Sequence, residues 1–472
     1  MSKTQAASCG PLWPRMPNIP RFFFQTAVTF GYELQEIAGR SSMNDSDKTT
    51  PAAHDPYGAL RHHDFRIFSI GLVLAFVGNA MQSVAVGWDL YERTDKAWVL
   101  GGVGLVQVLP VFLLALPAGH LADRFDRRRI MLVTLMVSML CSLGLAAFSL
   151  MGGAIAPIQY AYSLYVCLFV NAVARAFHGP ANASLWPQLI PSSLYSNAVT
   201  WRSGGFQFAN VVGPALAGLL IAWQKSATLV YVVDATLSLS FLLMLLPIKP
   251  RPSTHAPEPM MLHTLMAGVR FVWQTKVILA AVTLDMFAVL LGGATALLPI
   301  YAKDILRVGP TGLGWLRAAP AFGALLMAAG QVHVPPPRRA GRALLWAVAG
   351  FGMATIVFGV SRSFWLSLVM LALTGALDNI SVVVRHSLVQ LRTPDAMRGR
   401  VSAVNGVFIS SSNELGMFES GAVAALFGAV VSVVSGGVGA IAVVLATAFI
   451  WPEIRRLGAL QVTTDVATDE RQ

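Results

Sequence analysis

Charged residues are scarce in this sequence. Asp, Glu, Lys and Arg together make up 12% of the 472 residues, whereas ordinary soluble proteins carry about 25%. Hydrophobic residues make up 55%, so the chain lacks the composition of a disordered protein, which combines high charge with low hydrophobicity. Water-soluble cores do not enclose so large an apolar fraction. We therefore expect a protein whose main solvent is lipid.

Cysteine and the common catalytic motifs are also scarce or missing. Cys9, Cys141 and Cys167 lie far apart, so they predict neither a disulfide framework nor a metal site. The nucleotide-binding pattern Gly-x-x-x-x-Gly-Lys-Ser/Thr does not occur, and neither does Gly-x-Ser-x-Gly or His-Glu-x-x-His. We expect no cofactor, no metal ion, no enzymatic activity and no ATP-driven step.

Negative charge is the rarer sign, with 23 Asp and Glu against 34 Lys and Arg and a net charge of +11. In a soluble protein this excess would suggest nucleic-acid binding. In a membrane protein it is typical of basic cytoplasmic loops. No basic motif rich in aromatic residues occurs, so we favour the loops and expect no nucleic-acid partner.

Long apolar stretches are what the sequence does contain. From Phe65 onward they recur at about 20 residues, the length at which a helix spans a bilayer. Hydrocarbon offers backbone groups no water partner, so such spans must be helical. The sequence predicts an all-α membrane protein with twelve spans, placed at 66–91, 98–119, 130–151, 159–181, 199–222, 228–247, 277–300, 311–331, 343–361, 364–386, 401–425 and 431–451.

The distribution of basic residues predicts the orientation. Loops on the side of the two termini hold 14 Lys and Arg residues, and loops on the opposite side hold 6. Because basic loops stay on the cytoplasmic side, we expect both termini in the cytoplasm and the protein in the bacterial inner membrane.

A weak repeat divides the spans into two halves. A shift of 203 residues pairs Gly213 with Gly416 and Gly218 with Gly421, as expected when two six-helix halves repeat in parallel. The predicted organisation is a disordered cytoplasmic tail (1–60), a first six-helix bundle (61–247), a cytoplasmic linker with an amphipathic helix (248–276), a second six-helix bundle (277–452) and a cytoplasmic tail (453–472).

The clearest motif, Gly-His-Leu-Ala-Asp-Arg-Phe-Asp-Arg-Arg-Arg, occupies residues 119–129 between the second and third spans. A basic anchor loop would explain its arginines but not its glycine or its Asp-Arg pair. The stretch resembles the signature loop of the major facilitator superfamily, although Asp126 stands where that pattern usually has glycine. The resemblance implies the major facilitator fold of two six-helix bundles, and a conformational gate formed by Gly119, Asp123, Arg124, Arg127 and Arg128.

The resemblance also implies a role for this loop. In the superfamily its acidic residue docks against the start of the eleventh helix, which here begins near Arg398. A carboxylate is favourable at a helix N-terminus, so the implied contact is physically reasonable. We therefore expect Asp123 to meet that helix.

Further segments point to efflux. Gly213, Pro214 and Gly218 resemble a motif of the superfamily's drug–proton antiporters, although small residues also serve close helix packing alone. Segments around Arg175, and others in the seventh and eleventh spans, resemble the bacterial branch that contains the enterobactin exporter. This resemblance implies export without implying which compound is exported.

Charges inside the spans are the remaining clue, because each costs about 3 kcal/mol or more at the bilayer centre. Asp89 and Asp234 lie near span ends, where we expect them to reach the headgroups. Asp285 and Glu414 lie deeper and are our preferred proton-binding carboxylates, with structural ion pairs as the alternative. We hypothesise that Arg175 faces a central cavity, where it orients an anionic substrate group or holds a carboxylate charged. The proton and substrate candidates are Arg175, Asp285, Asp378, Arg385, Glu414 and Glu419.

These observations predict a secondary active transporter that exports a small amphipathic compound, such as a siderophore, drug or metabolite, by proton antiport and alternating access. Import of a metabolite by symport is an alternative. A receptor or scaffold that retains the transporter fold is an alternative of another class. The expected partners are the lipid bilayer, a small-molecule substrate and protons, and we expect a monomer.

Overall fold

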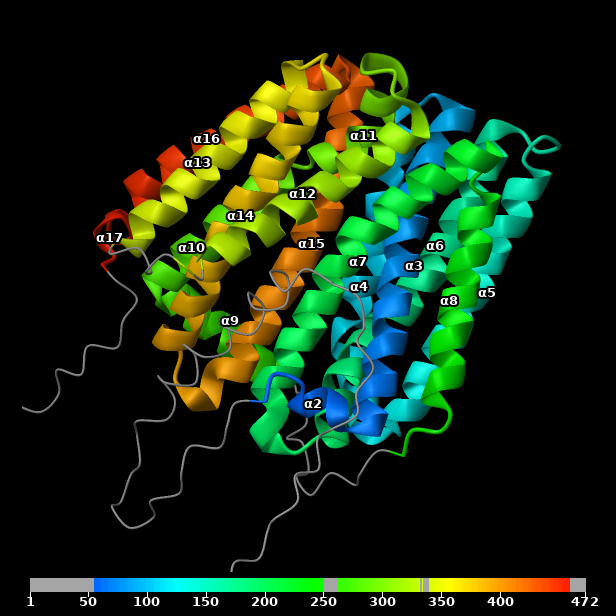
Figure 1. The fold of residues 1–472 in the computed structure, drawn as a ribbon. Helices are drawn as coiled ribbons and strands as arrows, with labels where there is room; N and C mark the ends of the chain where they lie inside the picture. The colour runs from blue at the N-terminus through cyan, green and yellow to red at the C-terminus, as the bar shows by residue number, and fades with distance from the viewer. Residues whose placement is uncertain (1–54, 250–261, 332, 334–338, 459–472) are drawn as a thin grey trace, which may run out of the picture.

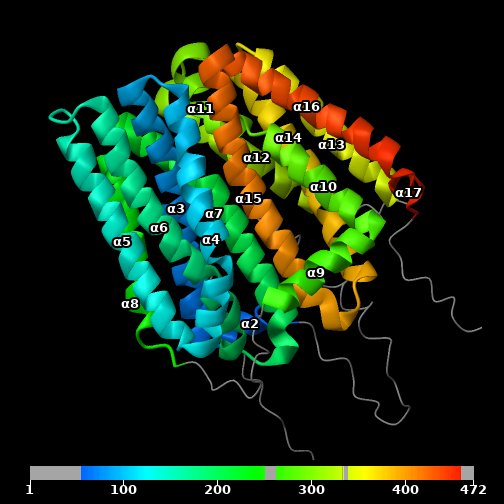
Figure 2. The ribbon, with the colours of Figure 1, turned by 180° about the vertical axis from the view of Figure 1, so that it is seen from behind.

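The computed structural model describes residues 55–249, 262–331, 333 and 339–458. Within these ranges the chain forms helices and turns, with no β-strand. Figure 1 shows two helical bundles side by side, which meet at their upper ends and diverge toward their lower ends. Figure 2 shows the same arrangement from behind. The predicted all-α fold is confirmed.

The first bundle has six long helices, each of which overlaps a predicted span and mostly extends a few residues beyond it. The connection between the fourth and fifth consists of two 3-10 turns, η2 (Trp186–Leu189) and η3 (Ser192–Leu194). The six helices are α3 (His63–Thr94), α4 (Ala97–Arg124), α5 (Arg127–Met151), α6 (Pro157–Leu185), α7 (Tyr195–Gln224) and α8 (Thr228–Leu245).

A short helix, α2 (Gly58–Arg61), precedes the first bundle. The backbone N–H of Ala59 donates to the Asn197 side chain of α7 over 3.1 Å, and Asn197 donates to the Pro56 carbonyl over 2.8 Å. The last residues of the tail that we predicted for 1–60 are therefore structured, from residue 55 onward. Its earlier residues lie outside the described part, as do residues 459–472 of the predicted C-terminal tail.

The second bundle follows a linker helix, α9 (Leu262–Gln274), which lies where an amphipathic helix was predicted. Residues 250–261 of the predicted linker lie outside the described part. The elements of the second bundle are α10 (Lys276–Leu291), η4 (Ala294–Leu297), α11 (Leu298–Ile300), η5 (Tyr301–Ile305), α12 (Gly309–Gln331), α13 (Ala340–Val360), α14 (Phe364–Arg392), α15 (Asp395–Phe427), α16 (Ala429–Ile450) and α17 (Pro452–Arg456).

The seventh predicted span, 277–300, is confirmed as part of a helical segment, Lys276–Ile305, that is long and apolar enough to cross a membrane, but it is interrupted rather than one regular helix. Helix α10 ends at Leu291, and the span continues as a short 3-10 helix (η4), a single turn of α-helix (α11) and a π-helical turn (η5). The break lies at Gly292 and Gly293, and glycine weakens a helix interior. A Cβ added at Gly293 would lie 2.6 Å from the Gly416 carbonyl oxygen of α15. Two backbones therefore touch here, which only a residue without a side chain permits.

Eleven helices in the described ranges are long and apolar enough to cross a membrane. Helix α15 is equally long, at 33 residues, but the polar run 410–414 makes it less apolar. It packs against α4, α10 and α16 within the fold. A helix surrounded by protein tolerates polar residues better than one facing lipid, so we count α15 as the twelfth span.

Two seams join the bundles, one between α4 and α15 and one between α7 and α12. At each seam, one glycine from each of the two helices lies at the contact. A Cβ added at Gly101 would lie 2.9 Å from the Gly421 Cα, and one added at Gly218 would lie 3.0 Å from the Gly314 Cα. The backbones are therefore in direct contact, as small residues allow in membrane helices.

Candidate functional site

One ion pair joins α6 of the first bundle to α15 of the second. Nη2 of Arg175, on α6, lies 3.5 Å from Oε1 of Glu414, on α15. The Arg175 side chain is 36% exposed and the Glu414 side chain 17%. The second carboxylate oxygen of Glu414 is buried and has no hydrogen-bond partner. The pair is thus incompletely satisfied and open to a solute on the arginine side.

A second arginine lies beside this pair. Arg317, on α12, donates to the Thr295 carbonyl over 3.1 Å and to the Ser83 hydroxyl of α3 over 3.3 Å. Its charge also interacts with Glu414. Among the described residues Glu414 forms its ion pair with Arg175 alone, but two guanidinium groups, which stay protonated in proteins, lie within electrostatic reach of this one carboxylate. The cluster of Arg175, Arg317 and Glu414, here called the central cluster, carries excess positive charge and suits an anionic group.

Sequence reasoning named Arg175 and Glu414 but did not pair them, and it left Arg317 out of the site. The available signal for Arg317 was a charge inside a predicted span. The pairing of Arg175 with Glu414 joins residues 239 positions apart, and no local pattern shows which face of each helix points inward.

The second bundle holds its own buried ion pair. Arg385 of α14 pairs with Asp285 of α10, and their side chains are 3% and 8% exposed. Nε of Arg385 has no hydrogen-bond partner. A buried pair of this kind is costly to break, because either partner alone would remain as an uncompensated charge. This is the ion-pair alternative that the sequence left open for Asp285.

The other two candidates of this bundle are not in that pair. Asp378 lies two helical turns before Arg385 on α14 and lines a small pocket that Asp285 also lines. Glu419, one turn along α15 from Glu414, accepts a hydrogen bond from the Ser420 hydroxyl over 3.3 Å. The six candidates are therefore divided between the central cluster, the Asp285–Arg385 pair, the pocket and a separate position on α15.

Asp234 does not reach the membrane headgroups, which corrects our expectation. It is 4% exposed. Its Oδ2 accepts hydrogen bonds from the Gln82 side chain over 2.9 Å and from the Ser142 hydroxyl over 2.7 Å. The expectation failed because proximity to a helix end does not reveal which way the side chain points.

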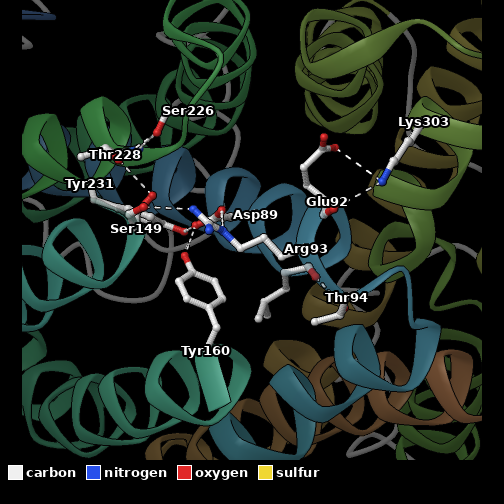
Figure 3. A network of polar contacts seen from close by, with 11 residues as sticks. Asp89, Glu92, Arg93, Thr94, Ser149, Tyr160, Ser226, Thr228, Tyr231 and Lys303 are labelled. Atoms are coloured by element: carbon white, nitrogen blue, oxygen red, sulfur yellow. Dashed lines mark hydrogen bonds and ion pairs between the residues drawn. The ribbon is translucent and has the colours of Figure 1, made fainter. Parts of the chain in front are cut away.

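Asp89 is likewise 4% exposed and points into the first bundle. Arg93 donates to its carboxylate over 2.8 Å, and Tyr160 and Tyr231 also donate to it. Figure 3 shows these side chains converging from three helices. The network fixes the upper end of α3 against the rest of its bundle.

That end of α3 also contacts the second bundle. Nζ of Lys303, in η5, lies 2.7 Å from Asp95 and 3.6 Å from Glu92, as Figure 3 shows in part. Tyr91 donates a hydrogen bond to Asp304 beside it. These upper contacts were missed, because Lys303 lies just beyond a predicted span and looked like an ordinary loop charge.

The signature loop connects α4 to α5. Asp126, at the position where the superfamily pattern has glycine, is the N-cap of α5 and accepts from the Arg128 backbone N–H over 2.9 Å. The Arg128 side chain donates to the Leu245 and Leu246 carbonyls at the end of α8. A cation there satisfies free carbonyls and the helix dipole. The Asp123 side chain lies outside the described residues, and its expected contact with α15 stays a prediction.

The antiporter-like motif lies where α7 crosses two helices. A Cβ added at Gly213 would lie 2.9 Å from the Val77 carbonyl of α3, and Gly218 faces Gly314 of α12. The carbonyl of Pro214 also lies against Gly314. The motif therefore provides close packing at a seam between the bundles, whatever further role it has.

Comparisons with known proteins agree with this geometry. A family model described as transmembrane secretion effector matches residues 54–464. The multidrug efflux pump Tap of Mycolicibacterium fortuitum is 26% identical over 363 residues, covering 74% of this chain and 86% of that protein. The enterobactin exporter EntS of Shigella boydii serotype 4 is 24% identical over 397 residues, covering 84% of this chain and 93% of that protein.

Solved transporters share the fold. The nucleoside transporter NupG superposes with a TM-score of 0.67 at 11% identity, covering 82% of this chain and 99% of that one. A bacterial homologue of the iron transporter ferroportin, in an inward-facing state, gives 0.65 at 15% identity, covering 83% and 98%. The chain therefore belongs to the transmembrane secretion effector family of the major facilitator superfamily, and is a multi-pass membrane transporter rather than an enzyme.

Proposed function

We propose that this transporter exports a small amphipathic compound with an anionic group, in exchange for protons, by alternating access. The observation that carries the proposal is the central cluster, in which Arg175 and Glu414 pair across the two bundles. A contact that bridges two moving bodies must break when they rock. Whatever breaks it controls the transport cycle.

The pair accounts for exchange in the following way. With nothing bound, Arg175 and Glu414 neutralise each other and hold the bundles together. An anionic substrate group competes with Glu414 for Arg175, and a proton on Glu414 also removes the attraction. Either ligand alone thus permits the change of state, whereas the empty protein stays locked. This is the requirement for antiport, since a ligand shifts an equilibrium only by its differential affinity for the two states.

The other sequence candidates have supporting roles in this proposal. The residues of the signature loop, Gly119, Asp123, Arg124, Arg127 and Arg128, act as the gate on the cytoplasmic side. The upper contacts of Lys303 and Asp304 act on the opposite side. The protein works as a monomer in the bacterial inner membrane with both termini in the cytoplasm. The basic loops and the export functions of Tap and EntS support this orientation and direction.

Transport in inside-out vesicles tests the proposal. Vesicles that contain the protein receive an inwardly acidic proton gradient, and uptake of enterobactin and of ethidium is followed. We expect gradient-dependent uptake, stronger for the anionic siderophore. Arg175→Ala abolishes it, whereas Arg270→Ala, at an exposed position of α9, preserves it.

Two results contradict the proposal. One is uptake that is equal with and without the gradient, which excludes proton exchange. The other is full uptake by Arg175→Ala, which excludes the central cluster. Arg175→Lys retains the charge and controls for misfolding.

A further inference from the structure

The pocket in the second bundle lies between α10, α13 and α14, away from the seams. Its polar residues are Asp285, Asp378 and Ser381, and its apolar lining includes Val289, Val348 and Phe351. It has room for about one water molecule. It is therefore too small for an organic substrate and of the right size for a single ion.

The charges around this pocket do not balance. Arg385 neutralises Asp285. The Asp378 carboxylate has no hydrogen bond or ion pair with any residue in the described part of the chain. An isolated carboxylate inside a transmembrane bundle is unfavourable unless a cation or a proton joins it.

Charged groups on the neighbouring helices are engaged elsewhere. Arg317, on α12, donates to Thr295 and Ser83. Glu414, on α15, pairs with Arg175. Helix α13 contributes apolar side chains to the pocket, and its one charged residue, in its first turn, is not among the lining residues. On α10 and α14 the charged groups that face Asp378 are Asp285 and its partner Arg385.

A second, independent observation comes from Ser381. It is 2% exposed, and its hydroxyl has no hydrogen-bond partner. Many buried hydroxyls in these helices donate to a backbone carbonyl of the preceding turn, as Thr374 does over 2.7 Å and Ser412 over 2.7 Å. Ser381, like Ser69 and Ser411, belongs to the smaller group of buried hydroxyls that have no partner. Ser381 instead leaves its oxygen free beside Asp378. Buried polar groups are rarely left without a partner, so this oxygen points to an occupant.

We propose that the pocket binds one small monovalent cation, a proton or a sodium ion, with the Asp378 carboxylate receiving its charge and the Ser381 hydroxyl as a neighbouring oxygen. Carboxylate and hydroxyl oxygens are suitable partners for both, since hard cations prefer oxygen ligands. Any part that this cation takes in transport, in addition to the proton on Glu414, rests on the proposed function, but its binding does not require transport.

Because of the position of Asp285, a bound cation would change the contact between α10 and α14. Asp285 lines the pocket and also pairs with Arg385. A cation in the pocket competes with Arg385 for this carboxylate and weakens the contact between α10 and α14. Occupancy of the pocket is thereby transmitted to the broken seventh span, whose continuation η5 forms the upper contacts.

Thermal unfolding of the purified full-length protein in detergent tests the proposal, because a ligand that binds only the folded state raises the melting temperature. One series replaces choline chloride by sodium chloride at about pH 8, with potassium chloride as the salt control. A second series lowers the pH toward about 6 without sodium. We expect the wild type to gain several degrees in one series, sodium identifying a metal-ion site and acid identifying a proton site. Asp378→Asn loses that gain, whereas Asp126→Asn, at the exposed cap of α5, retains it.

The two ions are separated further by Ser381→Ala, which raises the sodium concentration needed for half the effect several-fold but leaves an acid response in place. If Asp378→Asn does not yield folded protein, Asp378→Glu shifts the midpoint instead. The proposal is overturned if the wild type responds to neither series, or if Asp378→Asn responds as the wild type does. Since no substrate is present, failure here leaves the export experiment unaffected, and loss of export leaves cation binding measurable.

Discussion

Arg175 and Asp378 occupy equivalent positions in the two halves, 203 residues apart, but carry opposite charges and make different contacts. Arg175 reaches across to Glu414 in the other bundle. Asp378 stays inside its own bundle, beside the Asp285–Arg385 pair. We infer that the two halves have different roles. The first half supplies Arg175, which contacts the substrate, and the second supplies Asp378, which holds the cation.

The seams show the opposite behaviour. The same shift relates Gly218 to Gly421, and both remain glycine because each touches the backbone of a helix in the other bundle. The packing glycines of the two halves thus match, whereas the charged residues at the equivalent positions Arg175 and Asp378 differ. The shape of the fold and its chemistry are separable, as expected when function lies in sites placed on a common fold.

The largest effect is expected when the buried pair of Asp285 and Arg385 in the second bundle is disrupted. Arg385→Ala leaves Asp285 buried without a partner and lowers the free energy of unfolding by about 3–5 kcal/mol. Replacing both residues, in Asp285→Leu/Arg385→Met, recovers much of that loss. Arg392→Ala, at the exposed end of the same helix, is the control. Thermal unfolding followed by tryptophan fluorescence measures all three. A loss no larger than that of the control would show that the pair is unimportant for stability.

The sequence predicts those features of the fold and the site that depend on neighbouring residues, and it does not predict those that depend on contacts between distant helices. The spans were predictable because lipid requires long apolar helices. The break at Gly292 was not, since it depends on the approach of α15. Glu414 was recognised as a costly charge, but its partner lies in the other half. Asp234 was expected at the headgroups but points into its bundle, because packing decides which face of a helix points inward. Lys303 carried no signal, because a charge beside a span is ordinary.

A smaller effect tests the equivalence of the seams. Gly421→Ala and Gly218→Ala each place a methyl group against another backbone, and we expect each to cost about 1–3 kcal/mol and to impair transport similarly. Gly406→Ala, on α15 with no atom within 4 Å of the added Cβ, is the matched control and is neutral or stabilising. Unequal losses would show that the two seams are not equivalent. The measurements are thermal unfolding and vesicle uptake.

The smallest effect concerns the upper contacts. Lys303→Ala removes a surface ion pair in which Lys303 is half-buried and Asp95 is exposed, and costs up to about 1 kcal/mol. Hydrogen–deuterium exchange at the end of α3 should increase as the bundles separate there. Lys276→Ala removes a more exposed pair with Glu453 at 3.8 Å, and should leave that exchange unchanged. Equal hydrogen–deuterium exchange in the two variants would show that the upper contacts do not hold the bundles together.

We have proposed that the pair of Arg175 and Glu414 controls the exchange of substrate for protons. Exchanging the two charges tests it most directly. Proton-driven uptake of enterobactin is measured for Arg175→Glu, for Glu414→Arg and for the double variant. We expect each single variant to lose uptake and the double variant to recover part of it, because the pair is restored beside Arg317. Full uptake by either single variant would show that the pair does not control the exchange.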